Sequence, residues 1–299
     1  MILNIDKLCE SVTAKGHVCV GLDTAVDYVP QKERRRAVSD AGAVLDYNRA
    51  IIDATLDIAA CYKVQIAYYE ELGVAGLQTY SETLKYIRGK GALVIADIKR
   101  GDIADTATRY ARAHFEGDFE ADFVTLSPYL GMDAVEPWLQ WADSKGKGAF
   151  VLMRTSNRGM KDFQYLKTGP DRRLYDEVAD KLSALMESRK GRYGYGAFGV
   201  VVGADPKSEE EKKEAAAIRT QRPDLFFLIP GYGAQGGAAA DAVLLLRNGN
   251  GGVVNASRSI IKAWSAAGDN ADADNAFAAA KAREAAITMR DAIRNELAK

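Results

Sequence analysis

The sequence predicts a (β/α)8 TIM barrel of the α/β class. Short β-rich runs alternate with longer helical stretches along the chain, a pattern typical of parallel strands joined by helical crossovers. There are eight such runs, which is the number of strands in this barrel. No linker rich in Pro, Gly or Ser divides the 299 residues. We therefore expect a single domain over residues 1–299, with a leading N-terminal helix and a C-terminal helix.

Each expected strand is an apolar run bounded by turn residues. The eight are residues 17–23, 60–65, 93–99, 122–127, 148–155, 198–203, 225–230 and 252–257. Amphipathic or alanine-rich stretches predict helices at 39–59, 102–115, 171–189, 209–220 and 272–297. An open, doubly wound sheet is the alternative architecture. Eight units in about 250 residues favour the closed barrel.

Composition excludes several classes of partner. The net charge is −1, so no overall basic character favours nucleic acid or an anionic membrane. No apolar run reaches the roughly 18–20 residues of a membrane span, and we expect no signal peptide at the N-terminus. The three cysteines, Cys9, Cys19 and Cys61, form no CxxC pair. Reduced thiols and a cytoplasmic location are therefore expected.

The third expected strand ends in alternating charges, Asp97, Lys99 and Asp102. Residues two apart in a strand project to the same side, so Asp97 and Lys99 should point together. Charges at the end of a strand are costly to desolvate unless they pair or take part in chemistry. The carboxyl ends of barrel strands carry chemistry, so an electrostatic site is expected here. Asp102 could instead cap the following helix.

Other polar residues recur at the same end of the expected strands: Asp23, Lys63, Ser156, Ser257 and Arg258. A metal site built from Asp97 and Asp102 is not expected, because Lys99 and Lys63 would repel a cation. The two histidines, His17 and His114, fall at the wrong end of a strand and late in a helix. They are expected to be structural.

A glycine-rich turn, P-G-Y-G-A-Q-G-G at 230–237, follows the seventh strand. It contains a formal dinucleotide-binding pattern, but the next strand ends in Arg258 where that fold needs an acid. Barrels bind phosphate in the loops after strands seven and eight, using backbone N–H groups. We therefore expect a phosphate site with Gln235 and Arg258 as added donors. A tight turn that needs positive φ angles is the alternative.

The motif D-I-K-R-G-D-I-A-D-T, together with C-Y-K-V-Q, P-G-Y-G-A-Q-G-G and S-R-S-I, resembles the orotidine 5′-phosphate decarboxylase family. The segment T-S-N-R-G-M-K-D-F-Q and the chain length resemble its longer bacterial-type subfamily, type 2. The resemblance runs from the first expected strand to the eighth. One departure is Arg158, where family members often have proline.

This resemblance implies a carboxy-lyase that converts orotidine 5′-monophosphate (OMP) to UMP, the last step of de novo pyrimidine synthesis, without a cofactor. It assigns catalytic roles to Lys99, Asp97, Asp102 and Lys63. Lys99 would stabilise and protonate the C6 carbanion, and Asp97 would lie close to the departing carboxylate.

The resemblance also implies a homodimer with shared active sites. Asp102, Ile103 and Thr106 match positions that family members contribute to the neighbouring subunit's site. Lys63 and Asp23 match ribose contacts, Ser156 the pyrimidine contact, and Gln235 and Arg258 the phosphate contacts. Pro230 and Ser257 complete the expected substrate-binding set.

Two alternative functions remain open. A magnesium-dependent sugar-phosphate decarboxylase of the same suprafamily would carry a carboxylate in place of Lys63. A non-catalytic nucleotide-binding barrel would be expected to have lost Lys99.

Overall fold

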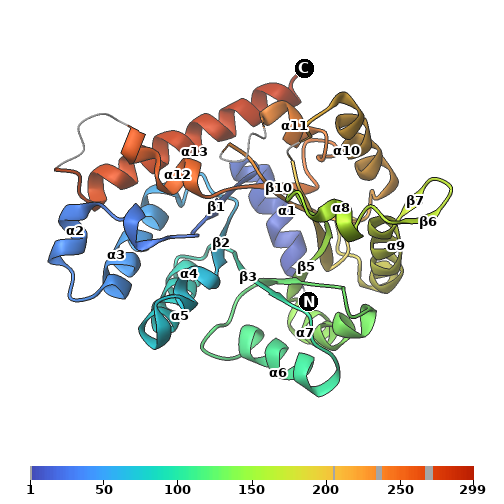
Figure 1. Ribbon diagram of the computed structural model, residues 1–299, viewed down its shortest axis with the longest axis horizontal. Helices are drawn as coiled ribbons and strands as arrows, with labels where there is room; N and C mark the ends of the chain where they lie inside the picture. The colour runs from blue at the N-terminus through green and yellow to red at the C-terminus, as the bar shows by residue number, and fades with distance from the viewer. Residues whose placement is uncertain (1, 205, 234–237, 267–271) are drawn as a thin grey trace.

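Eight parallel strands close into a barrel in the computed structural model, which describes residues 2–204, 206–233, 238–266 and 272–299 (Figure 1). Around the barrel the order is β1, β2, β3, β4, β5, β8, β9, β10, and β10 pairs with β1. This closure confirms the predicted barrel over the open sheet. The strands are β1 Val18–Gly21, β2 Cys61–Gln65, β3 Val94–Arg100, β4 Phe123–Leu126, β5 Gly148–Arg154, β8 Phe198–Val202, β9 Phe227–Pro230 and β10 Gly252–Ala256.

Helices surround the barrel, and α13 packs against α3, α11 and α12. Polar side chains set where several begin: Ser39 accepts from the Gly42 N–H and Asp274 from the Phe277 N–H, which are N-cap bonds. The helices are α1 Asn4–Lys15, α2 Gln31–Arg36, α3 Asp40–Thr55, α4 Ala67–Glu70, α5 Gly73–Gly89, α6 Ala104–Phe115, α7 Leu139–Lys145, α8 Met160–Phe163, α9 Leu174–Met186, α10 Glu209–Gln221, α11 Ala239–Val243, α12 Arg258–Ile261 and α13 Asn275–Leu297.

Four of the five expected helices begin one to three residues later than predicted, at Asp40, Ala104, Leu174 and Asn275. The stretch expected as a helix from residue 171 starts instead within a small antiparallel hairpin, β6 Lys167–Gly169 and β7 Arg172–Arg173, and α9 follows it. Figure 1 shows this hairpin projecting beside α9. The G-P-D sequence at its tip is a turn signal that should have prevented the error. Helix α6 begins at Ala104 rather than at residue 102.

The barrel interior has an apolar amino end. Because side chains alternate along a strand, one parity of each strand faces inward. At the amino end these residues, among them Cys19, Ile95 and Phe123, pack against Ile5 and Leu8 of α1 in one buried cluster. Helix α1 crosses the ring of strands in Figure 1. Helix α1 therefore closes the amino end of the barrel. The polar inward-facing residues lie at the carboxyl end.

The three cysteines are free and buried. Within the described ranges, no helix is both long and apolar enough to cross a membrane.

Candidate active site

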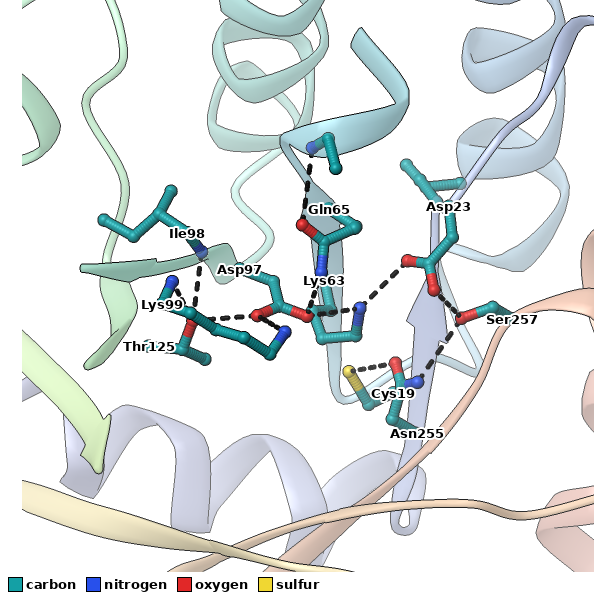
Figure 2. Close-up of polar contacts among 12 residues, drawn as sticks. Cys19, Asp23, Lys63, Gln65, Asp97, Ile98, Lys99, Thr125, Asn255 and Ser257 are labelled. Carbon is teal, nitrogen blue, oxygen red and sulfur yellow. Dashed lines mark hydrogen bonds and ion pairs between the residues drawn. The ribbon is translucent and has the colours of Figure 1, made fainter. Parts of the chain in front are cut away.

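Four charged side chains form an alternating chain at the carboxyl ends of β1, β2 and β3 (Figure 2). Lys63 Nζ lies 2.9 Å from Asp23 Oδ1 and 3.0 Å from Asp97 Oδ2. Lys99 Nζ lies 2.6 Å from Asp97 Oδ1. Strand register brings them together, because Gly21 pairs with Lys63 and Gln65 pairs with Asp97. The sequence-predicted cluster thus gathers Asp23, Lys63, Asp97 and Lys99, which we call the charge network.

The centre of the charge network is buried and ionised. The side chains of Lys63 and Asp97 are 5% and 8% exposed. Burial alone would lower the pKa of Lys63, but the charges of Asp23 and Asp97 outweigh it and the pKa is raised. Burial would raise the pKa of Asp97, but Lys63 and Lys99 hold it well below its usual range. Each buried charge is therefore sustained by its opposite neighbours.

The Asp97 carboxylate accepts four hydrogen bonds. Oδ1 accepts from Lys99 Nζ and from the Thr125 hydroxyl at 2.8 Å. Oδ2 accepts from Lys63 Nζ and from Gln65 Nε2 at 2.9 Å. A carboxylate offers about four lone-pair sites, so the orientation of Asp97 is fixed. Sequence reasoning missed Thr125 and Gln65. Strand parity could have found Gln65, which lies two residues after Lys63 on the same face of β2.

Lys99 reaches Asp97 by a route that strand alternation did not predict. Its φ is +45°, a left-handed backbone that is uncommon outside glycine, and the pairing of β3 with β4 shifts register between Ala96 and Arg100. The regular two-residue alternation therefore ends at Lys99. Its ammonium still contacts Asp97, and its side chain remains 48% exposed. Lys99 is the accessible end of the charge network.

Ser257 supports the other end of the charge network. Its hydroxyl donates to Asp23 Oδ2 at 2.9 Å and lies 3.4 Å from Asn255 Nδ2. This approach needs glycine at position 21, because a Cβ there would collide with the Ser257 hydroxyl. Asp23, Ser257 and Asn255 thus come from β1 and β10 or their ends, across the point where the barrel closes.

The charge network lines a cavity of about 270 Å³. Pro230, the last residue of β9, also lines this cavity, as do Tyr232, Ser257 and Arg258, which follow β9 and β10. The ends of the two strands whose loops are expected to bind phosphate therefore lie at the same cavity as the charges. Arg258 supplies a guanidinium suited to a phosphate group. Tyr68 of α4 also lines the cavity, and nothing in the sequence singled it out.

Four predicted site residues do not line this cavity among the residues that the structure describes. Asp102 accepts the Ile103 N–H at 2.9 Å but is not the N-cap of α6, which is Ile103. Ile103 and Thr106 are exposed at the start of α6. Ser156 packs closely on Gly203, where an added Cβ would lie 2.7 Å from its own. Gln235 lies outside the described residues.

Both histidines are buried, and neither lines the cavity. Burial lowers the pKa of His17 to about 4 and that of His114 to about 3. In the described part of the chain, no three His, Cys, Asp or Glu residues are grouped so that they could hold a metal ion.

Sequence comparison decides the family. The model of the orotidine 5′-phosphate decarboxylase / HUMPS family matches residues 16–270. The chain belongs to this family. It is 51% identical over 294 residues to the orotidine 5′-phosphate decarboxylase of Clostridium perfringens, covering 98% of this chain and 99% of that protein. The corresponding protein of Clostridium acetobutylicum is also 51% identical, over 293 residues, with 98% and 99% covered.

Family membership extends to solved structures. The structure of Leishmania donovani OMP decarboxylase superposes with a TM-score of 0.71 at 33% identity, covering 97% of this chain and 100% of that one. The expected resemblance to orotidine 5′-phosphate decarboxylases is thereby confirmed.

Proposed function

We propose that this protein decarboxylates OMP to UMP without a cofactor. The observation that carries the proposal is a half-exposed ammonium, Lys99, held at the edge of a cavity by a buried carboxylate, Asp97. Relatives that match over almost their whole length are orotidine 5′-phosphate decarboxylases.

The reaction needs a cation where a carbanion forms. The bond between C6 and the carboxylate breaks, CO2 leaves, and the electron pair stays on C6. The Lys99 ammonium stabilises this charge and then donates a proton to C6, giving UMP; the amine regains a proton from solvent. A pair of charges 4 Å apart contributes about 4 kcal/mol at an effective dielectric constant near 20.

That single pair is insufficient, because the largest enzymatic barrier reductions reach roughly 23 kcal/mol or more. Binding energy from the remote phosphate must contribute, and Arg258 and Gln235 are proposed to supply it. Asp97 is proposed to contribute as well, by facing the substrate carboxylate. Its four hydrogen bonds prevent it from turning away, so the like charges are relieved only when CO2 departs.

Most of the other proposed substrate contacts involve residues that line the cavity. Lys63 and Asp23 are proposed to bind the ribose, since both line the cavity beside Lys99. Pro230 and Ser257 are proposed to complete the cavity wall. Ser156 does not line the cavity among the described residues, and its proposed contact with the pyrimidine rests on the family resemblance.

A homodimer with shared sites is the proposed assembly. Asp102, Ile103 and Thr106 lie outside the cavity of their own chain. Ile103, the N-cap of α6, and Tyr110 on α6 are exposed apolar side chains, as are Tyr129 and Leu130 after β4. Exposed apolar side chains in this part of the chain support a contact with a second subunit. In the dimer the partner subunit's Asp102 would join Lys99. The free, buried cysteines support a cytoplasmic location.

The test is turnover of OMP by purified protein treated with EDTA, followed by ultraviolet absorbance. We expect UMP at a rate unchanged by added magnesium. Absence of turnover would refute the proposal. Turnover only with magnesium would also refute it and would favour a metal-dependent decarboxylase.

A further inference from the structure

Thr125, on the inward face of β4, is joined to the charge network although it does not line the cavity among the described residues. The residue is 1% exposed. Its hydroxyl donates to Asp97 Oδ1 at 2.8 Å. The Thr125 hydroxyl oxygen in turn accepts hydrogen bonds from the backbone N–H groups of Ile98 at 3.0 Å and Lys99 at 2.9 Å, as Figure 2 shows.

These three bonds use the full capacity of a hydroxyl, which has one proton to donate and two lone pairs. One side chain therefore fixes two things at once: the direction of the Asp97 carboxylate and the path of the backbone at Lys99. Cysteine, serine and valine are close to threonine in size, but valine has no hydrogen-bonding group at this position.

The backbone at Lys99 needs such a restraint. A non-glycine residue with φ of +45° is held there only when its surroundings determine the conformation, and such residues cluster at functional sites. Two consecutive N–H groups bound to one oxygen define the turn from Ile98 to Lys99. Without the hydroxyl, both N–H groups would lose their partner, and the turn could relax toward the extended region.

We propose that Thr125 is a positioning residue that fixes where the Lys99 ammonium and the Asp97 carboxylate lie relative to each other. The inference rests on the proposed decarboxylase function. Because Thr125 acts through these two side chains and not on the substrate, its loss affects the chemical step more than substrate binding.

The experiment compares wild type, Thr125→Val, Thr125→Cys and Thr125→Ser in steady-state turnover of OMP, with folding checked by circular dichroism. We expect kcat to fall about 10- to 100-fold in the valine variant, with KM changed by less than about threefold. The cysteine variant, whose thiol bonds weakly, should show the same loss, and serine should restore kcat to within about threefold of wild type. Cysteine keeps the test valid if the valine variant does not fold.

Thr79→Val is the matched control. Thr79 is a buried threonine whose hydroxyl donates to the Ala41 carbonyl at 2.9 Å, between α5 and α3. Its loss should reduce stability while leaving kcat per folded molecule unchanged. Valine or cysteine variants with wild-type kcat, or a folded serine variant as impaired as valine, would overturn the inference. Inactive wild type would instead refute the decarboxylase proposal itself.

Discussion

Two carboxylates, Asp97 and Glu214, each bind several donors, but they differ in what they leave accessible. Asp97 is held between two lysines at the cavity, and one of these, Lys99, is half exposed. Glu214, on α10, accepts hydrogen bonds from Tyr165, Arg173 and Tyr175 and lies 3.7 Å from Arg154.

The Glu214 cluster, as we call these five residues, joins α10 to the segment that follows β5. Arg154 is the last residue of β5, its side chain is 2% exposed, and it also donates to the Gly203 carbonyl. None of its members lies at the cavity within the described residues. The charge network thus leaves a cation accessible at the cavity, whereas the Glu214 cluster holds the segment that carries Ser156 against α10.

The largest effect is expected at the accessible end of the charge network. Lys99→Ala should lower turnover by at least about 10⁴-fold, because both the stabilising cation and the proton donor are lost. The free energy of unfolding should change by less than about 1 kcal/mol, since Lys99 itself is half exposed and the buried Asp97 keeps its ion pair with Lys63. Kinetic assay and thermal unfolding would measure both. Substantial destabilisation of the Lys99→Ala protein would show that Lys99 stabilises the fold, and would contradict the difference drawn between the charge network and the Glu214 cluster.

Subunit complementation tests whether the charge network is completed by a partner. Asp102→Ala is expected to be inactive, as is Lys99→Ala. In a mixed dimer, one site retains both groups, so an equal mixture should recover about a quarter of wild-type activity, given random pairing of subunits. The assay is turnover after subunit exchange. No recovery, once exchange has been verified by differently tagged subunits, would contradict shared sites.

The Glu214 cluster should show the reverse pattern. Glu214→Gln should lower the free energy of unfolding by about 2 kcal/mol, because the buried Arg154 loses a nearby charge. KM for OMP should rise several-fold while kcat falls less, since the affected segment carries a proposed substrate contact. Denaturant unfolding and steady-state kinetics measure these. Glu210→Gln, exposed on the same helix, is the control; an equal effect there would remove any special role for Glu214.

A last prediction concerns acid stability, which we assign to the histidines and not to the charge network. The folded-state pKa values of His17 and His114, about 4 and about 3, lie below the ordinary value near 6.5. Below pH 6.5 the unfolded chain gains protons that the folded protein does not. Stability is therefore full above this pH and falls by up to about 1.4 kcal/mol per pH unit for each histidine down to about pH 4.

The stability that Asp97 gains from its lowered pKa is lost mainly below about pH 4, where the unfolded carboxyl takes up its proton, so it adds little to the slope in that window. His114→Gln should flatten the dependence of the melting temperature on pH between 6.5 and 4. An unchanged slope would mean that other groups control acid unfolding.

Strand parity explains how much of the site was predictable from sequence. Asp23, Lys63, Asp97 and Ser257 were correctly placed together because inward-facing positions at the carboxyl end of a barrel meet. The left-handed turn at Lys99 was not predictable, since it depends on a hydroxyl from the neighbouring strand, Thr125.

Other features depend on contacts distant in sequence. In the Glu214 cluster, Glu214 contacts residues that lie 39 to 60 positions before it in the sequence. No local sequence pattern predicts such contacts. The hairpin before α9 was missed because the expected helix was begun at Asp171, which is the last residue of the G-P-D turn. Asp102 remains a prediction, because its proposed role needs a second copy of the chain.

The most direct test of the account is the fate of C6 in the reaction. OMP would be incubated in D2O with EDTA-treated wild type and with Lys99→Ala, and the product followed by proton NMR. We expect UMP carrying deuterium at C6 from wild type, delivered by the exchanged Lys99 ammonium, and no enzymatic product from the variant. Protium at C6, or wild-type rates without Lys99, would contradict it.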